Sequence, residues 1–194
     1  MSAIISNTTG NNALLTPVRL LYVHLMSFPT ATSALAAWIS ARGLCAENIR
    51  AKVLEQAFGS DEAKRKGAIA TRRVLLMCGP YILSRATIVY RDHLLPAELR
   101  SQLRSTDLPF GDIVKSLSPS RLTTFAGLIA APRTAASRDS IYPFTPILEL
   151  HATVTTADLG PIARVREVYG ACLLLNTSFA RDHAHGQPRD SEVA

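Results

Sequence analysis

The chain has 194 residues, 47% of them hydrophobic and 19% charged, which fits one domain with a substantial core and excludes disorder over most of its length. The formal charge is +6 at pH 7, carried mostly by arginine. Because the arginines are scattered along the sequence and aromatic residues make up only 6%, we expect no nucleic-acid partner.

The first part of the chain predicts a helical hairpin. Residues 1–12 are rich in serine, threonine and asparagine and are expected to form a flexible tail. Apolar residues then recur at helical spacing over residues 14–26, until Ser-Phe-Pro ends the pattern. Thr30 or Thr32 can cap a second helix that runs to about residue 42.

The middle of the chain mixes helical and strand patterns. Residues 46–58 fit a helix by propensity. Residues 68–77 and 81–90 are rich in branched apolar residues and flank a Cys-Gly-Pro turn, which predicts a β-hairpin. Residues 94–103 form a short helix with proline in its first turn, and residues 108–117 form a turn and helix able to fold over a cavity mouth.

The remainder predicts strands that complete a sheet. The expected segments are a strand at 120–129, a proline-containing loop at 130–146, closing strands or strand-like segments at 148–155, 162–168 and 170–179, and a flexible polar tail at 181–194. The whole is then one α+β domain, residues 13–180, with an antiparallel sheet of about six strands and helices on one side.

Arginines set into predicted strands are the main candidates for chemistry. They are Arg72 or Arg73, Arg85, and the pair Arg164 and Arg166. Successive strand residues face opposite sides, so only one of Arg72 and Arg73 can enter a cavity. A buried charge needs a partner, so an inward arginine without a protein carboxylate implies an anionic ligand. The alternative is that these arginines lie on a solvated face.

Other reactive residues give weaker signals. Cys45, Cys78 and Cys172 are odd in number and widely spaced, so neither a disulfide framework nor a zinc site is indicated, and a cytoplasmic location is expected. The most apolar early stretch is interrupted by proline and arginine, so no membrane association is expected. His183 and His185 lack a third ligand nearby, so no metal is expected.

Two further histidines, His24 and His151, are interpreted as satisfied core residues rather than catalytic ones. No Ser-His-Asp order, phosphate loop or Gly-x-Gly-x-x-Gly motif is present in the sequence, and no cofactor is expected. Arginine is well suited to bidentate binding of small carboxylates, so the expected partner is a small acidic substrate.

Five short motifs occur in an order that resembles the chorismate pyruvate-lyase (4-hydroxybenzoate synthase) family. They are Thr-Ala-Thr-Ser-Ala-Leu at 30–35, Arg-Val-Leu-Leu-Met-Cys-Gly at 73–79, Leu-Ser-Arg-Ala-Thr-Ile-Val at 83–89, Leu-Pro-Ala-Glu-Leu at 95–99 and Pro-Phe-Gly-Asp-Ile at 109–113. The resemblance implies a six-stranded antiparallel sheet with helical flaps over a buried ligand, and a strand rather than a helix at residues 46–58. It also implies cofactor-independent cleavage of chorismate to 4-hydroxybenzoate and pyruvate.

The resemblance assigns roles by position. It makes Arg73 the essential catalytic arginine, with Arg72 the fallback if the register slips by one residue, and Arg85 a second substrate-binding arginine. Phe110 and Gly111 match the flap that covers the ligand. In the matching first motif, Ala31 stands where the family has a pocket-lining methionine or leucine, and Thr32 follows it.

One departure concerns the family's last strand, which ends in a Thr-Glu pair whose glutamate contacts the ligand. The matching stretch, residues 173–179, has Asn176 and Thr177 instead. A hydroxyl can form a hydrogen bond at these substrate-contacting positions but cannot act as an acid near neutral pH. Glu149 and Glu167 are the nearest carboxylates able to substitute.

Three functions follow as alternatives. The first is a cofactor-independent enzyme acting on a small acidic unsaturated metabolite, with chorismate lysis as the most specific case. The second is a cyclase or pericyclic enzyme of secondary metabolism that reuses the cavity, and the third is a non-catalytic ligand-binding domain. A compact pocket favours a chorismate-sized dianion, whereas an elongated apolar tunnel favours a cyclase. The oligomeric state is not predicted.

Overall fold

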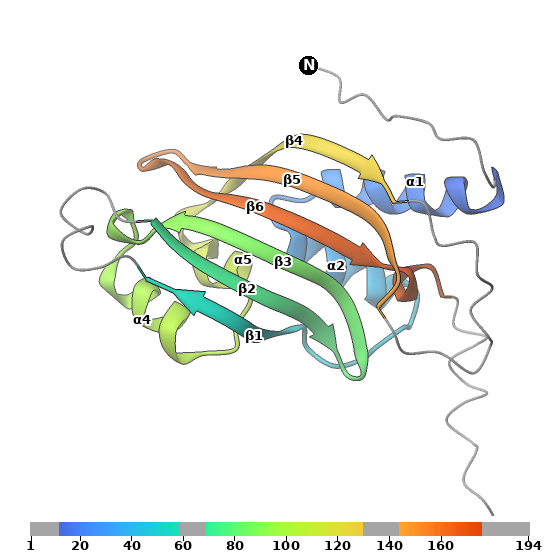
Figure 1. The fold of residues 1–194 in the computed structure, drawn as a ribbon, viewed down its shortest axis with the longest axis horizontal. Coiled ribbons are helices and arrows are strands. Elements are labelled where there is room, and N and C mark those ends of the chain that lie inside the picture. Colours follow the sequence, from blue (N-terminus) through green and yellow to red (C-terminus); the bar gives the residue numbers. More distant parts are fainter. Residues whose placement is uncertain (1–11, 59–68, 130–143, 176–194) are drawn as a thin grey trace, which may run out of the picture.

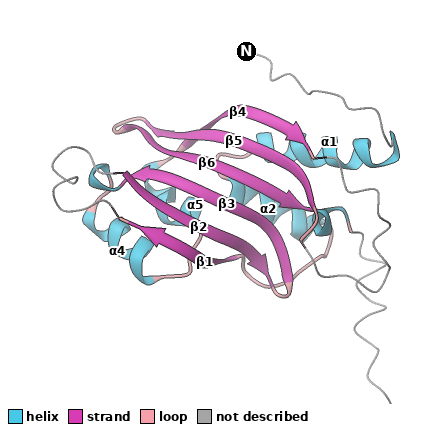
Figure 2. Ribbon diagram, in the orientation of Figure 1, coloured by secondary structure: helices cyan, strands magenta, loops and turns pink. Residues whose placement is uncertain are grey.

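The computed structural model describes residues 12–58, 69–129 and 144–175. Within them a six-stranded antiparallel sheet has the order β1-β2-β3-β6-β5-β4, and helices cover one of its faces (Figures 1 and 2). The strands are β1 (Arg50–Ala57), β2 (Ile69–Cys78), β3 (Tyr81–Arg91), β4 (Ser120–Leu128), β5 (Pro146–Thr156) and β6 (Gly160–Gly170). This architecture confirms the predicted α+β fold class. The predicted tails, residues 1–12 and 181–194, lie outside the described residues except for Asn12.

The sheet consists of two three-stranded meanders that meet where β3 pairs with β6. Alternate residues of each central strand are buried under the helices, as in β2, where Ala70, Val74 and Leu76 are almost fully covered. The predicted hairpin at β2–β3 turns through Gly79, whose φ of +53° is a conformation that glycine adopts without steric penalty. We call the face without helices the open face.

Two helices at the start of the chain pack under the sheet, as predicted. They are α1 (Asn12–Met26) and α2 (Ala31–Ala41). Thr30 caps α2, because its Oγ1 accepts a hydrogen bond from the backbone N–H of Ser33 at 3.1 Å. The ring of Trp38 on α2 is buried, and its Nε1 donates to the carbonyl oxygen of Leu173 at 2.8 Å.

The long connection from β3 to β4 supplies the remaining helices. It contains η1 (Asp92–Leu94), α4 (Ala97–Ser105), α5 (Phe110–Ile113) and η2 (Val114–Leu117). We call residues 109–117 the flap, because α5 lies against α2 on the helical face and η2 packs against α5 (Figure 1). Ser118 ends the flap in a left-handed conformation with a φ of 48°.

At residues 46–58 the strand implied by the resemblance is confirmed, and the helix favoured by propensity is wrong. This segment contains the edge strand β1, because its backbone pairs with β2 along seven residue positions and such tertiary contacts override propensity. The closing strand expected at 170–179 is also absent from its described part, since β6 ends at Gly170 and η3 (Ala171–Leu174) follows.

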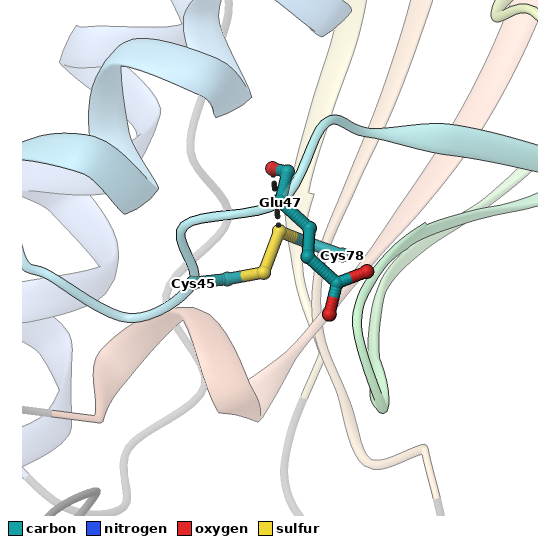
Figure 3. Close-up of a disulfide and its surroundings, with 3 residues drawn as sticks. All are labelled: Cys45, Glu47 and Cys78. Atoms are coloured by element: carbon teal, nitrogen blue, oxygen red, sulfur yellow. Dashed lines mark hydrogen bonds between the residues drawn. A yellow bond between two sulfur atoms is a disulfide. The ribbon is translucent and has the colours of Figure 1, made fainter.

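A disulfide joins Cys45, in the loop after α2, to Cys78, the last residue of β2 (Figure 3). The Cα atoms are 6.1 Å apart, within the range that a disulfide spans. The expectation that the cysteines form no disulfide is therefore wrong, because β2 brings together two residues that lie far apart in sequence. Cys172 is free, and burial raises the pKa of its thiol to about 11.

In the part of the chain that the structure describes, no helix has the length and apolar character needed to cross a membrane.

We expect reduction of the Cys45–Cys78 disulfide to lower the free energy of unfolding by at most about 3–4 kcal/mol, because the bond closes a loop between residues 33 apart in sequence. Urea denaturation with and without reductant measures this difference. In urea without reductant, a thiol assay is expected to detect Cys172 alone. Detection of all three thiols before reduction contradicts the disulfide.

Candidate functional site

A small cavity lies between the helical face of the sheet, the start of α2 and the flap. Its volume is about 40 Å³. Its walls come from all the strands except β1, and its lining residues are Pro29, Thr30, Ala31, Thr32, Val74, Leu76, Ala86, Ile88, Phe110, Gly111, Val114, Arg121, Val154, Val165 and Glu167. The lining is therefore mostly apolar, with a single pair of charged side chains.

Those two charged side chains form a buried ion pair. Arg121, on the edge strand β4, donates through Nη2 to Oε2 of Glu167 on β6. The Tyr169 hydroxyl donates to the same carboxylate oxygen at 2.9 Å. The side chains of Arg121 and Glu167 are only 4% and 7% exposed.

The guanidinium of Arg121 is only partly satisfied. Among the described residues, its Nε and Nη1 atoms are buried and have no hydrogen-bond partner. A guanidinium carries five N–H donors, and unpaired buried donors are unfavourable. The arrangement leaves donor capacity at the polar end of an apolar cavity, which suits a ligand with a hydrogen-bond acceptor.

The surroundings keep Arg121 and Tyr169, the two donors to Glu167, in their protonated forms. Burial acts to lower the pKa of Arg121, but Glu167 and Tyr169 more than offset it, so this pKa is raised and the guanidinium stays charged. Burial raises the pKa of Tyr169 well above its ordinary value, so its hydroxyl remains protonated. The cluster is a fixed source of hydrogen bonds.

Four of the residues that the resemblance places at the ligand lie in the cavity wall. Ala31 and Thr32 are in the first turn of α2, and Phe110 and Gly111 begin α5 in the flap. The Phe110 ring is buried, and its centroid lies 5.8 Å from that of Tyr90 on β3. The α2 and flap motifs therefore meet across the cavity, although they are about 80 residues apart in sequence.

The inward arginine of β2 is Arg72, so the expectation that Arg73 enters the cavity is wrong by one residue. Arg73 is exposed and forms an ion pair with Glu55 at 2.8 Å. Arg72 is fully buried, and its pKa is lowered by that burial. Its Nη2 and Nη1 donate to the carbonyl oxygens of Thr106 and Leu108, at 2.9 and 3.2 Å. Arg72 thus holds the chain just before the flap rather than lining the cavity.

The other expected arginine also faces away from the cavity. Arg85 is exposed on the open face, where its guanidinium carbon lies 4.3 Å from the ring centroid of Phe144. His151, expected in the core, is likewise on the open face, whereas His24 is satisfied by a 2.8 Å hydrogen bond to the carbonyl oxygen of Ala34. Asn176 and Thr177, His183 and His185 lie outside the described residues.

Of the two carboxylates named as able to substitute for the family's glutamate, Glu167 lines the cavity and Glu149 does not. The last described strand is β6, and Glu167 near its end faces the cavity. Arg121 was not selected from the sequence. Its only signal was a cation at the start of a predicted strand, and its partner lies 46 residues away.

We expect Arg121→Met to lower the free energy of unfolding by about 3–5 kcal/mol, because it leaves the Glu167 carboxylate buried without its cation. The double variant Arg121→Met/Glu167→Leu should recover most of this loss. The exposed pair offers a matched control, since Arg73→Met should change stability by only about 0–1 kcal/mol. Urea denaturation checks all three, and an equal loss in the single and double variants contradicts the pairing.

We expect Gly111→Ala to loosen the flap. A Cβ at this position meets the Cβ of Thr30 at 3.0 Å and Oγ1 of Thr32 at 3.1 Å, and such overpacking costs about 1–3 kcal/mol. That loss exceeds the gain of up to about 1 kcal/mol from replacing a helical glycine with alanine. Hydrogen exchange over residues 109–117 is expected to accelerate in Gly111→Ala, but not in the exposed control Asp112→Ala. Slower exchange in Gly111→Ala contradicts the close packing.

No protein-family model matches the sequence. The uncharacterized protein y4mC of Sinorhizobium fredii (strain NBRC 101917 / NGR234) is 33% identical over 111 residues, which cover 52% of this chain and 47% of that protein. The chain thus spans about half the length of the curated relative it matches.

Several solved structures are similar at low sequence identity. The effector domain of PhnF from Mycobacterium smegmatis is 13% identical with a TM-score of 0.44, covering 74% of this chain and 89% of that one. The C-terminal domain of Yurk from Bacillus subtilis subsp. subtilis str. 168 is 16% identical with a TM-score of 0.38, covering 62% of this chain and 89% of that one. These similarities are too distant to assign a function.

Proposed function

We propose that the chain is a binding domain for a small acidic molecule, held in the cavity by Arg121. The observation that carries this proposal is the pair of buried, unpartnered guanidinium nitrogens at the polar end of the apolar cavity. A carboxylate or phenol oxygen at that end supplies the missing acceptor. The remaining walls, which are aliphatic except for Phe110 and the threonines Thr30 and Thr32, suit an unsaturated or aromatic body.

Binding requires the flap to move. The cavity of about 40 Å³ is far smaller than the roughly 300–1,000 Å³ of pockets that enclose a small-molecule ligand. The flap is suited to opening because α5 and η2 are each a single turn. The buried Arg72 fastens the chain before Pro109, so opening about this point leaves the sheet undisturbed.

Chorismate lysis is the second candidate, and Glu167 favours it. The resemblance calls for a carboxylate at the ligand's phenol end, and Glu167 offers one from the last described strand. Arg73 is exposed and paired with Glu55, so the catalytic role first given to it passes in this proposal to Arg121 and Glu167, which line the cavity. The volume of about 40 Å³ gives no support to the long tunnel that a cyclase would need.

A thermal-shift and calorimetry experiment with 4-hydroxybenzoate as the probe tests the binding site. We expect this acid to stabilise the wild-type protein, by about 2.7 kcal/mol at 100 times its dissociation constant. The variant Arg121→Met/Glu167→Leu should lose the stabilisation, whereas the exposed Arg73→Met should retain it. Equal stabilisation of all three proteins contradicts a site at Arg121.

The same protein incubated with chorismate separates the two candidates. A binding domain releases no pyruvate above the spontaneous background, as measured with lactate dehydrogenase and NADH. Pyruvate release by the wild type that is lost in Glu167→Gln supports the lyase and contradicts a purely binding function. The probe 4-hydroxybenzoate still reports on the cavity in either case, because it is the aromatic product of that reaction.

A further inference from the structure

The fold gathers basic side chains on the open face of the sheet. Antiparallel pairing aligns Lys52, Leu75, Arg85, Val168 and Glu149 in one row across five strands. The neighbouring row contains Glu55, Arg73, Thr87, Arg166 and His151, and the next contains Arg164 beside Thr153. Charges that are scattered in the sequence are therefore neighbours in space.

Positive charge is in excess on this face. The basic residues at its alternate positions are Arg50 and Lys52 on β1, Arg73 on β2, Arg85 and Arg91 on β3, and Arg164 and Arg166 on β6. The carboxylates at equivalent positions are Glu55 and Glu149. Because the whole chain has a formal charge of only +6, the open face carries most of its net charge.

Most of these cations have no carboxylate partner within the described residues. Glu55 pairs with Arg73, and Glu149 pairs with Arg166 and with Nε2 of His151, each at 2.7–2.8 Å. The described part of the chain gives Arg85 and Arg164 no ion pair, and both are exposed. No described helix covers this face (Figure 2). The unpaired cations of the open face therefore suit an extended anionic ligand.

We propose that the open face binds single-stranded nucleic acid through its phosphates. Guanidinium groups and hydroxyls are the donors that contact phosphate oxygens, and Thr87 and Thr153 alternate with the arginines here. The apolar side chains at the centre of this face, Leu75, Val89 and Val168, are only partly exposed and lie between arginines and threonines. An anionic membrane, which takes up exposed apolar side chains, therefore fits less well.

A pair of rings at the β4 side of the face favours single strands over duplex. The rings of Phe125 and His151 lie 4.8 Å apart, and both side chains are nearly half exposed. Unpaired bases stack on such rings whatever their identity, whereas bases inside a duplex are not available to them. The expectation of no nucleic-acid partner assumed that arginines scattered in the sequence are also scattered in space. The strand pairing shows that several of them are neighbours on one face.

Fluorescence anisotropy with labelled 20-mers of dT and rU tests the proposal, with the full chain at 50 and 200 mM NaCl. We expect binding that weakens with salt and exceeds binding of a duplex of equal length. Arg85→Glu/Arg164→Glu should weaken binding at least about tenfold and reduce the salt slope by about 1.4, since each phosphate contact contributes about 0.7.

The matched control is Arg19→Glu/Arg100→Glu, which makes the same charge change on α1 and α4 and should retain most of the affinity. Circular dichroism and melting temperature verify that both variants fold. Absence of wild-type binding at 50 mM NaCl, equal losses in the two double variants, or equal binding of duplex overturns the proposal. Binding to phosphatidylserine vesicles without binding to either 20-mer also overturns it and points to a membrane.

Discussion

The ion pair between Arg121 and Glu167 is the constraint on which the cavity depends. Two charges held out of water are unfavourable unless each is matched, so the edge strand β4 must stay in register with β6 across β5. Tyr169 and the apolar walls reinforce this arrangement, because they exclude the water that could replace the pair. Nε and Nη1 of Arg121 find no acceptor among the described residues, so this is the place where a ligand can complete the hydrogen bonding.

Period-two geometry divides the arginines of this chain into two groups with different roles. Arg72 and Arg73 are adjacent in sequence, yet one is fully buried against backbone carbonyls and the other is exposed beside Glu55. A shift of one residue exchanges these environments. The same alternation places the Arg121–Glu167 pair, which has no net charge, on the helical face and an excess of cations on the open face. The two faces of the sheet therefore differ in chemistry.

Local patterns predicted much of the architecture but not its long-range pairs. The cap at Thr30, the β2–β3 hairpin and the flap are encoded within short segments, and the sequence identified all three. Propensity alone favours a helix where β1 lies, and only the resemblance implied the strand, because the partner strand decides the conformation of this segment. The pair Arg121–Glu167 and the disulfide join residues 46 and 33 positions apart, and neither leaves a local signal. Two adjacent arginines, Arg72 and Arg73, fit the strand pattern equally well, so the sequence did not decide which of them points inward.

The disulfide also gives the chain a covalent topology of its own. Cys45 and Cys78 close a ring that contains the whole of β1 and β2 and the connection between them. A single backbone cut anywhere between these cysteines leaves the chain in one piece as long as the bond is oxidised. After a cut between Cys45 and β1, the disulfide is the only covalent link between α2 and the sheet.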